Sequence, residues 1–490
     1  MGLSISKLDF NERLEQSKED VFMQKSVAKA QDAQWVKRES AREELGNWEG
    51  WRDLGEQMRQ HVLDYLPDYL EQFSDNVAKK GGHVFFAKDA KEAREYVEKV
   101  LVEKKAKKVV KSKSMVTAEV DIDPMIEKLG LEVMETDLAE FILQEDNWDE
   151  PSHIVFPAIH MNRDQIKEVF KEKLGYTGDN EPVNLARKAR EVMRQYFLEA
   201  DVGITGCNFA IADQGTINLN TNEGNADLTI GIPKTHIVMM GMERIVPSIK
   251  EAEVLDNMLA RSAVGQDITT YCTFVGPRET GESDGPDDFH VVIIDNGRSN
   301  ALGTEFQSVL QCIRCGSCLN VCPVYRQIGG HGYGSLYPGP IGISLTPVLG
   351  GYEEFHDLPY ACSLCTACDA TCPVKIPLHD LITYHRKVMT DDKHMGRGSF
   401  QDVQMHVVGK GTSSPTMFKS AMEFAHTGMK LLSSHKRDSV ENLYNNGGYM
   451  DKGPGMIKGW TDVRDLPIAP KAHDNFRHWY KRHEKEKGDE

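Results

Sequence analysis

The sequence predicts an α/β fold with a largely parallel sheet, followed by a cysteine-rich helical region and a helical C-terminal extension. Between about residues 51 and 300, helical patterns alternate with short apolar runs, which is typical of a parallel sheet covered by helices on both faces. Eight of the ten cysteines then fall between residues 312 and 372. The residues after 394 contain helical patterns and Gly-rich turns such as NNGGYMDKGPGM.

The apolar and helical patterns of the α/β region define its elements. Helices are predicted over 54–73, 89–105 and 182–200, and strands over 83–87, 107–112, 152–159, 235–241 and 289–295. We expect four regions in all: an N-terminal helical arm over 1–50 that lies over another surface, the α/β domain over 51–300, the cysteine region over 301–393 and the extension over 394–490.

Composition excludes several classes of protein. A chain of 490 residues with 40% hydrophobic and 27% charged residues is typical of a soluble protein of two or three domains. Its net charge of -17 would repel a phosphate backbone, so we expect no nucleic-acid partner. The chain contains no apolar run of the ~20 residues that span a bilayer, and its charged start lacks a secretory signal. A cytoplasmic protein without a transmembrane segment is predicted.

Two segments repeat one cysteine spacing, C-x2-C-x2-C-x3-C-P. The repeats are CIRCGSCLNVCP (Cys312, Cys315, Cys318, Cys322) and CSLCTACDATCP (Cys362, Cys365, Cys368, Cys372). In this spacing three cysteines hold one [4Fe–4S] cluster and the fourth ligates the cluster of the other motif. The repeat therefore predicts two [4Fe–4S] clusters, one held by Cys312, Cys315, Cys318 and Cys372, the other by Cys322, Cys362, Cys365 and Cys368.

Zinc is the alternative for these cysteines. Structural zinc usually takes two C-x2-C pairs across a longer loop, and neither three consecutive spacings nor the trailing proline suits it. The two remaining cysteines, Cys207 and Cys272, are expected to be small buried apolar residues.

The flanks of the quartets indicate a helical ferredoxin-type domain. The segments NALGTEFQSVLQCIRC and IPLHDLITYHRKVM both have apolar residues at helical spacing. The Gly-rich linker 329–342 lacks the G-x-G-x-x-G frame of a dinucleotide site and follows no strand, so a loop is predicted. This arrangement resembles the iron–sulfur subunits of fumarate reductase and heterodisulfide reductase.

Polar residues after predicted strands are the candidates for a small-molecule site. Lys111 and Lys113 follow one strand and suit a carboxylate or phosphate, and His160 with Arg163 follows another. The stretch GITGCNFAIADQGTINLNTNEGNADL, which contains Glu223, either binds an anion or forms tight turns between strands. A solvated turn for the lysines and a structural role for His160 are the simpler alternatives.

The stretches KSKSMVTAEV, ETDLAEFILQ, FPAIHMNRDQI, GCNFAIADQGTINLNTNEGN, GWTDVRDLPIAP and NFRHWYKRH, together with the quartets, resemble the lactate utilization protein B family over almost the whole chain. The resemblance implies a LUD domain, related in fold to ribose-5-phosphate isomerase and CoA-transferase-like proteins. It also implies an electron carrier in the oxidation of L-lactate to pyruvate, acting with a cysteine-rich partner and a second LUD-domain protein. All eight quartet cysteines match the family's motif, whereas the family offers no established catalytic residues.

Three functions follow as hypotheses. In the first, this chain relays electrons while a partner or the assembled interface oxidises L-lactate. In the second, the LUD domain itself oxidises the hydroxy acid, with His160 as base and Lys111, Lys113 or Arg163 holding the carboxylate. In the third, the α/β domain handles an acyl group or CoA, with Glu223 as a nucleophilic carboxylate.

Overall fold

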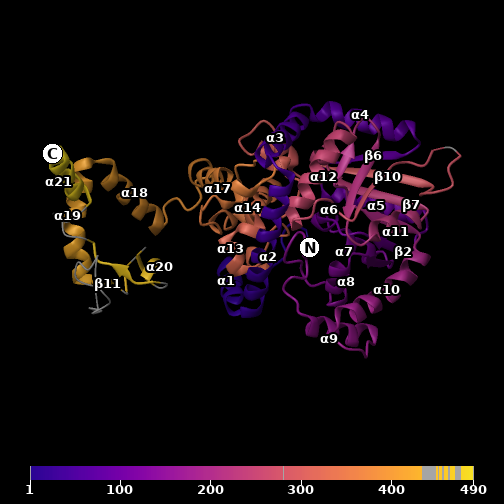
Figure 1. Cartoon of the computed structure of the whole chain (residues 1–490), viewed down its shortest axis with the longest axis horizontal. Helices are drawn as coiled ribbons and strands as arrows, with labels where there is room; N and C mark the ends of the chain where they lie inside the picture. Colours follow the sequence, from indigo (N-terminus) through magenta and orange to yellow (C-terminus); the bar gives the residue numbers. More distant parts are fainter. Residues whose placement is uncertain are drawn as a thin grey trace. The chain divides into compact units, whose positions relative to one another are not determined.

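The computed structural model of the chain describes residues 2–279, 281–432, 449–450, 452–454, 457–461, 464–469 and 476–488 (Figure 1). The chain divides into two compact units, residues 1–389 and 390–490. None of the helices in the described ranges has the length and apolar character needed to cross a membrane. The predicted domain boundaries within and between these units stay predictions.

A six-stranded sheet forms the centre of the α/β region. Its strands are β1 (His83–Ala87), β2 (Lys108–Lys111), β3 (Glu132–Glu135), β4 (Val202–Thr205), β7 (Thr235–Gly241) and β10 (Asp288–Ile294). They lie in the order β1-β10-β7-β4-β2-β3, and each neighbouring pair is parallel. The predicted parallel α/β fold is confirmed. The helices of the region are α3 (Trp48–Asp64), α4 (Leu66–Lys79), α5 (Ala90–Glu103), α6 (Met115–Glu119), α7 (Ile122–Lys128), α8 (Leu138–Glu145), α9 (Arg163–Leu174), α10 (Pro182–Glu199), α11 (Asn225–Gly231) and α12 (Ile249–Val264).

Helices bury both faces of this sheet. Successive residues of a strand point to opposite faces, so one strand contributes to two cores. On β10, Val291 and Ile293 belong to a core shared with α4 and α11, whereas Val292 and Ile294 belong to a second core with α5 and α7. The near-continuous apolar sequence of β7 and β10 follows from this double coverage. Figure 1 shows helices on either side of the strands.

The polar stretch from Gly203 to Leu228 folds as strands and one helix. It contains β4, β5 (Phe209–Ile211), β6 (Thr216–Thr221) and α11. β5 and β6 pair antiparallel and join β8 (Ile245–Val246) and β9 (Tyr271–Val275) in a four-stranded sheet of order β8-β5-β6-β9. The sequence predicts that this stretch either binds an anion or forms tight turns between strands. The turns between strands are present, and anion binding stays a prediction.

The strand predicted over residues 152–159 is wrong. This segment is a series of turns whose polar groups bond to the cysteine region and not to a sheet. The Tyr325 hydroxyl donates to the carbonyl of Ser152 at 2.8 Å, and the N–H of Gly330 donates to the Ser152 hydroxyl at 3.2 Å. Tertiary contacts therefore override the local apolar pattern.

The cysteine region is built from short helices around a core that it shares with α2 (Val21–Leu45), α3, β5, β8 and α12. They are η3 (Gln307–Gln311), η4 (Leu319–Val321), α13 (Pro323–Ile328), η5 (His331–Tyr333), α14 (Gly339–Gly350), α15 (Tyr352–Phe355), η6 (Leu358–Tyr360), α16 (Ala367–Thr371), α17 (Leu378–Lys387) and the π-helical turn η7 (Val388–Asp392). The linker 329–342 is a loop with one 3-10 turn, except that its last four residues already begin α14. The prediction of a loop holds for the rest.

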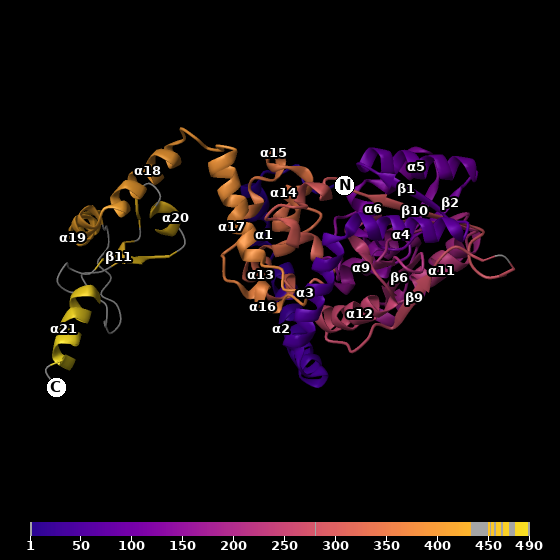
Figure 2. The same cartoon turned by 90° about the horizontal axis from the view of Figure 1, so that it is seen from above.

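The N-terminal helices α1 (Phe10–Glu19) and α2 lie against the cysteine region. The arm predicted over 1–50 stays a prediction. Aspartates cap both helices: Asp9 accepts the N–H of Glu12, and Asp20 accepts the N–H of Met23. The carboxamide nitrogen of Gln31 donates to the carbonyls of Leu319 and Cys322 at 2.9 and 3.1 Å. Figure 2 shows α1 and α2 beside α13.

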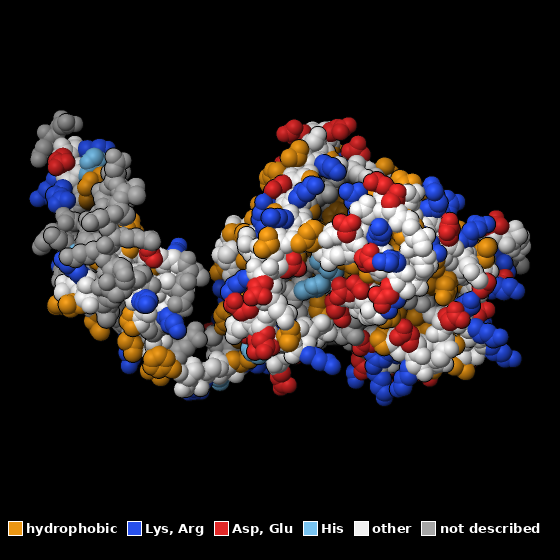
Figure 3. All heavy atoms as spheres, turned by 90° about the horizontal axis from the view of Figure 1, so that it is seen from below, with side chains coloured by type: hydrophobic (Ala, Val, Ile, Leu, Met, Phe, Trp, Pro, Cys, Tyr) orange, Lys and Arg blue, Asp and Glu red, His pale blue; other side chains and the backbone are white. Residues whose placement is uncertain are grey.

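The second unit contains α18 (Phe400–Ser413), α19 (Pro415–Leu432), α20 (Lys458–Thr461), α21 (Phe476–Gly488) and a two-stranded pair of β11 (Tyr449–Met450) with β12 (Leu466–Pro467). It is largely helical, as predicted. Its helices expose large apolar side chains, among them Phe400, Met417, Phe424 and Phe476. Figure 3 shows apolar side chains, in orange, on the surface of this unit.

We predict that His236 contributes to the acid sensitivity of the fold. Burial in β7 lowers the pKa of His236 to about 3, and its Nε2 lies 2.8 Å from the Thr205 hydroxyl. In the unfolded chain the pKa of His236 returns to about 6.5. Between that pH and about 3, only the unfolded state binds the proton. Stability falls as the pH drops, by about 1.4 kcal/mol per pH unit from this group.

The variant His236→Gln should therefore lose less of its melting temperature between pH 7 and 5 than the unchanged protein. Thermal unfolding followed by circular dichroism at several pH values measures this slope. The exposed His61→Gln in α3 is the matched control and should keep the original slope. An unchanged slope in His236→Gln would contradict the assignment.

Candidate functional site

The two cysteine motifs share one backbone conformation. Arg314 and Leu364 occupy equivalent positions with positive φ of 61° and 54°, and the N–H of each donates to the first sulfur of its motif at 3.3 Å. Gly316 and Thr366, two residues later, also have positive φ, of 72° and 63°. The repeat in sequence is thus a repeat in structure, with each loop wrapped around its own cysteines.

The fourth cysteine of each motif lies with the other motif. Cys372 lines one small cavity together with Cys312, Cys315 and Cys318, and apolar side chains such as Ile341 and Ile376 complete its wall. Cys322 interacts electrostatically with Cys362, and Cys368 interacts with both of these. Four cysteines thus share one cavity, and Cys322, Cys362 and Cys368 interact with one another. The crossed assignment of all eight cysteines stays a prediction.

Burial makes these sites unfavourable for free thiolates. It raises the pKa of the Cys315 thiol to about 11 and that of Cys372 to about 12. A metal centre binds the deprotonated sulfur and supplies the compensating positive charge. Backbone N–H groups also face the sulfurs, since Tyr325 donates to Cys322 and Ile376 to Cys372, both at 3.4 Å. Four clustered thiols with such donors fit a [4Fe–4S] cluster.

Buried arginines from the N-terminal helices surround the first set of cysteines. Arg38 of α2 donates to the Thr371 hydroxyl, and Arg52 of α3 donates to the Cys372 carbonyl at 2.8 Å. Burial, with some repulsion from Arg42, lowers the pKa of Arg38 to about 10, so it remains charged at neutral pH. Cys315 and Cys318 are among the groups that act on this guanidinium. The arginines thus place positive charge beside cysteines that become negative when they bind metal.

The two sets differ in exposure. The cysteines Cys315, Cys318 and Cys372 are buried, whereas Cys365 is exposed. Beside it, Leu364 is 36% exposed and Tyr360, in η6, is 53% exposed. The second set therefore approaches the surface of the unit, and the first lies toward its interior.

A buried ion network joins the α/β domain to the cysteine region. Arg298, which follows β10, donates to Glu119 of α6 and to Glu243, each at 2.8 Å. The Tyr337 hydroxyl of the Gly-rich linker donates to Glu119 at 2.6 Å. Burial alone would raise the pKa of Glu119 and Glu243, but the charge of Arg298 lowers both below their usual values.

The candidate lysines lie at the carboxyl end of β2. Lys111 is 1% exposed, and its ammonium forms ion pairs with Asp123, at 3.2 Å, and with Glu135. Burial favours its neutral form, yet the two carboxylates raise the pKa of Lys111 above its usual value. Lys113 is half-buried and donates to the carbonyl of Ile154 at 2.7 Å.

The other candidates lie on separate segments, His160 and Glu223 in turns and Arg163 in α9. His160 Nε2 is 2.8 Å from a carboxylate oxygen of Asp149, whereas the exposed Arg163 begins α9. Glu223 accepts the N–H of Leu138 at 3.0 Å and interacts electrostatically with Lys113. Lys113 and Glu223 are thus brought together.

Sequence reasoning missed the acidic partners Asp123, Glu135 and Asp149. Only the position of Glu135, at the end of an apolar strand, could have indicated one of them. The two lone cysteines also differ from expectation. Cys272 is exposed and its thiol donates to Asp256 at 3.2 Å, so the prediction of a buried residue is wrong for it. Cys207 is half-buried against the core of the α/β domain.

We predict that Arg298→Met loses about 3–5 kcal/mol of the free energy of unfolding, because buried Glu119 loses its counter-charge and buried Glu243 is left with the longer pair to Arg314. Thermal unfolding at one fixed heating rate should show a clear drop in melting temperature. The exposed Arg194→Met in α10 is the matched control, with a change of at most about 0.5 kcal/mol. Equal melting temperatures for the two variants would refute the network's role.

Two domain families match this chain. Residues 70–294 match the LUD domain, and residues 308–376 match the 4Fe-4S dicluster domain. The second match covers both quartets and identifies two [4Fe–4S] clusters as the cofactors of the chain. A solved structure of a DUF162 family protein from Deinococcus radiodurans is 17% identical, covers 47% of this chain and 98% of its own, and has a TM-score of 0.27, too low to compare the folds.

Curated relatives are similar over the full length. Lactate utilization protein B of Bacillus licheniformis is 53% identical and covers 100% of both chains. The proteins of that name from Geobacillus sp. (strain WCH70) and Bacillus velezensis are each 52% identical, covering 99% and 100% of both chains, respectively. At this identity and coverage, the chain belongs to the lactate utilization protein B family.

Proposed function

We propose that this chain relays electrons in the oxidation of L-lactate to pyruvate, within a multi-protein lactate utilization system of the cytoplasm. The name of its relatives points to lactate utilization, and the dicluster domain points to electron transfer. The observation that carries the proposal is the cavity that Cys372 shares with Cys312, Cys315 and Cys318, inside the same compact unit as the LUD domain, together with the interactions among Cys322, Cys362 and Cys368.

The proposed ligands follow the crossed arrangement. Cys312, Cys315, Cys318 and Cys372 would hold one cluster, and Cys322, Cys362, Cys365 and Cys368 the other. When bound, each cluster accepts or donates one electron at a time, and two of them match the two electrons that a hydroxy acid loses on becoming a keto acid.

The protein's own groups suit this role. The apolar cavity wall keeps water from the first set of cysteines, and the charges of Arg38, Arg42 and Arg52 offset the negative charge that four thiolates bring. The exposed side of the second set offers a place for exchange with another protein. We propose that its partners are a cysteine-rich lactate utilization protein and a second LUD-domain protein.

One geometric feature favours a second candidate function, in which the LUD domain itself oxidises the hydroxy acid. The 2.8 Å contact of His160 with Asp149 could orient the imidazole as a base, with Lys113 or Arg163 binding the carboxylate. Lys111 is less suited, because two buried carboxylates already hold its ammonium. An acyl- or CoA-handling role would instead need Glu223 as nucleophile, and its exposure is compatible with attack on a substrate.

We predict that L-lactate alone does not reduce the clusters of the full-length protein. The test is an anaerobic sample with both clusters reconstituted, followed by electron paramagnetic resonance, with dithionite as the positive control. Lactate should produce the reduced-cluster signal only after the partner proteins are added. Reduction by lactate alone, abolished in His160→Gln with its iron content intact, would show that the LUD domain holds the active site. Labelling of Glu223 by an acyl-CoA would support the third function instead.

The crossed ligand assignment has its own test. Replacing Cys362, Cys365 and Cys368 by alanine should leave one cluster and about four iron atoms per chain. Adding Cys372→Ala to this variant should then lower the iron content, because it removes a ligand of the remaining cluster. Adding Cys322→Ala is the matched control and should leave the iron content unchanged. The reverse pattern, in folded protein by circular dichroism, would mean that each motif holds its own cluster.

A further inference from the structure

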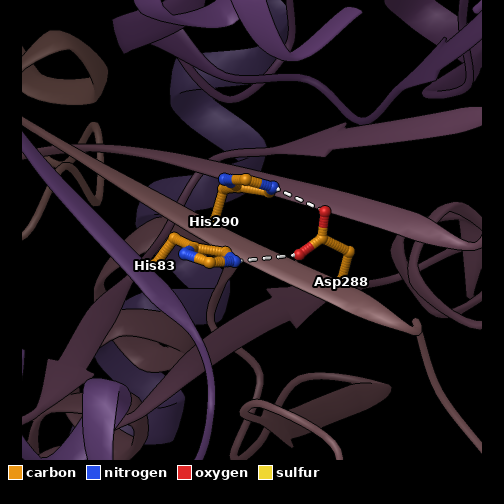
Figure 4. Close-up of side chains that lie close together, drawn as sticks. All are labelled: His83, Asp288 and His290. Carbon is orange, nitrogen blue, oxygen red and sulfur yellow. Dashed lines mark hydrogen bonds and ion pairs between the residues drawn. The ribbon is translucent and has the colours of Figure 1, made fainter. Parts of the chain in front are cut away.

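Two histidines and an aspartate converge at the amino-terminal edge of the six-stranded sheet (Figure 4). His83 begins β1, Asp288 begins the neighbouring β10, and His290 is the register partner of His83. One oxygen of Asp288 lies 3.2 Å from His83 Nε2, and the other lies 2.9 Å from His290 Nε2. We name these three residues the His–Asp–His cluster.

The positions of these ligand atoms suit a small cation. The three atoms all lie within 4.8 Å of one another. A tetrahedral zinc site with bonds of about 2.0 Å places its ligand atoms about 3.3 Å apart, and each imidazole Nε2 lies near this distance from one of the two Asp288 oxygens. Figure 4 shows the two imidazole rings side by side, with their Nε2 edges turned to the same carboxylate. Because paired strands hold all three residues, their geometry is fixed by the sheet.

Neighbouring groups orient the ligands as metal sites require. The Tyr96 hydroxyl lies 2.9 Å from His290 Nδ1, which leaves Nε2 as the nitrogen that faces Asp288. His83 is exposed, so a water molecule could complete the coordination.

Lys104 is the competing partner of the carboxylate. Its ammonium lies 2.5 Å from Asp288, on the oxygen that also faces His290. The Lys104 side chain is 39% exposed and can turn into solvent, whereas the other Asp288 oxygen faces only His83 in the cluster. A divalent ion would therefore compete with one ion pair, whose Lys104 side chain is partly exposed to solvent.

We propose that His83, Asp288 and His290 bind a first-row divalent metal ion, of which Zn²⁺ best fits two imidazoles, one carboxylate and one open position. This site is separate from the iron–sulfur region, because the chain reaches the cysteines only after the opposite, carboxyl end of β10. A bound ion would fasten the edge strand β1 to β10.

X-ray absorption spectroscopy at the zinc edge tests this site with a signal other than activity. The sample is full-length protein with both clusters in place, given one equivalent of Zn²⁺ and then passed through a desalting column. We expect about one zinc per chain, with a nitrogen and oxygen shell near 2.0–2.1 Å and imidazole scattering, and without the sulfur shell near 2.3 Å that cysteine would give.

Variants separate this site from adventitious binding. His83→Ala should weaken zinc binding at least tenfold. Tyr96→Phe should weaken it about tenfold, because it removes the hydrogen bond between the Tyr96 hydroxyl and His290 Nδ1. The matched control is His356→Ala, which removes an exposed histidine that also lies beside an aspartate. A sulfur shell, no retained zinc, or equal affinity in His83→Ala and His356→Ala would each overturn the proposal. Iron content and circular dichroism confirm that every variant is folded and loaded.

Discussion

The Arg298 guanidinium holds together the α/β domain and the cysteine region of the larger unit. It is fully buried and neutralises Glu119 and Glu243, which come from different segments of the α/β domain. Glu119 in turn accepts the hydroxyl of Tyr337 from the linker between the two quartets. Without this positive charge, Glu119 would be buried without a charged partner and Glu243 would keep only its longer pair with Arg314, a cost that no surrounding apolar contact offsets. The position of the linker, and with it the approach of one quartet to the other, depends on this network.

Buried positive charge recurs around the cysteines. Arg59 of α3 donates to the carbonyls of Ile245, Leu310 and Gln311, and Arg244 donates to the carbonyl of Cys312 at 2.7 Å. These guanidinium groups satisfy carbonyls that the short helices leave unpaired. They also favour negative charge on the nearby sulfurs. The same residues therefore stabilise the loops and prepare them for metal.

The larger unit has clusters of polar side chains at opposite ends of the strands of one sheet. The carboxyl ends of β2, β3 and β10 lead to the buried lysine and its acids and to the ion network of the cysteine region. The amino-terminal edge of β1 and β10 carries the His–Asp–His cluster. Because parallel strands place all like ends together, a single sheet keeps the iron–sulfur region apart from the proposed metal site.

The sequence alone determined the fold class and the cofactor. The parallel sheet followed from the alternation of apolar runs and helices, and the clusters followed from the repeated cysteine spacing, since both signals are local along the chain. The strand predicted over 152–159 failed because that segment bonds to Tyr325 and Gly330, which are more than 150 residues away. Only the tertiary structure paired Lys111 with Asp123 and Glu135, placed the arginines of α2 and α3 beside the cysteines, and set His83 opposite His290. These contacts join residues distant in sequence, and their chemistry depends on burial and register, which the folded chain decides.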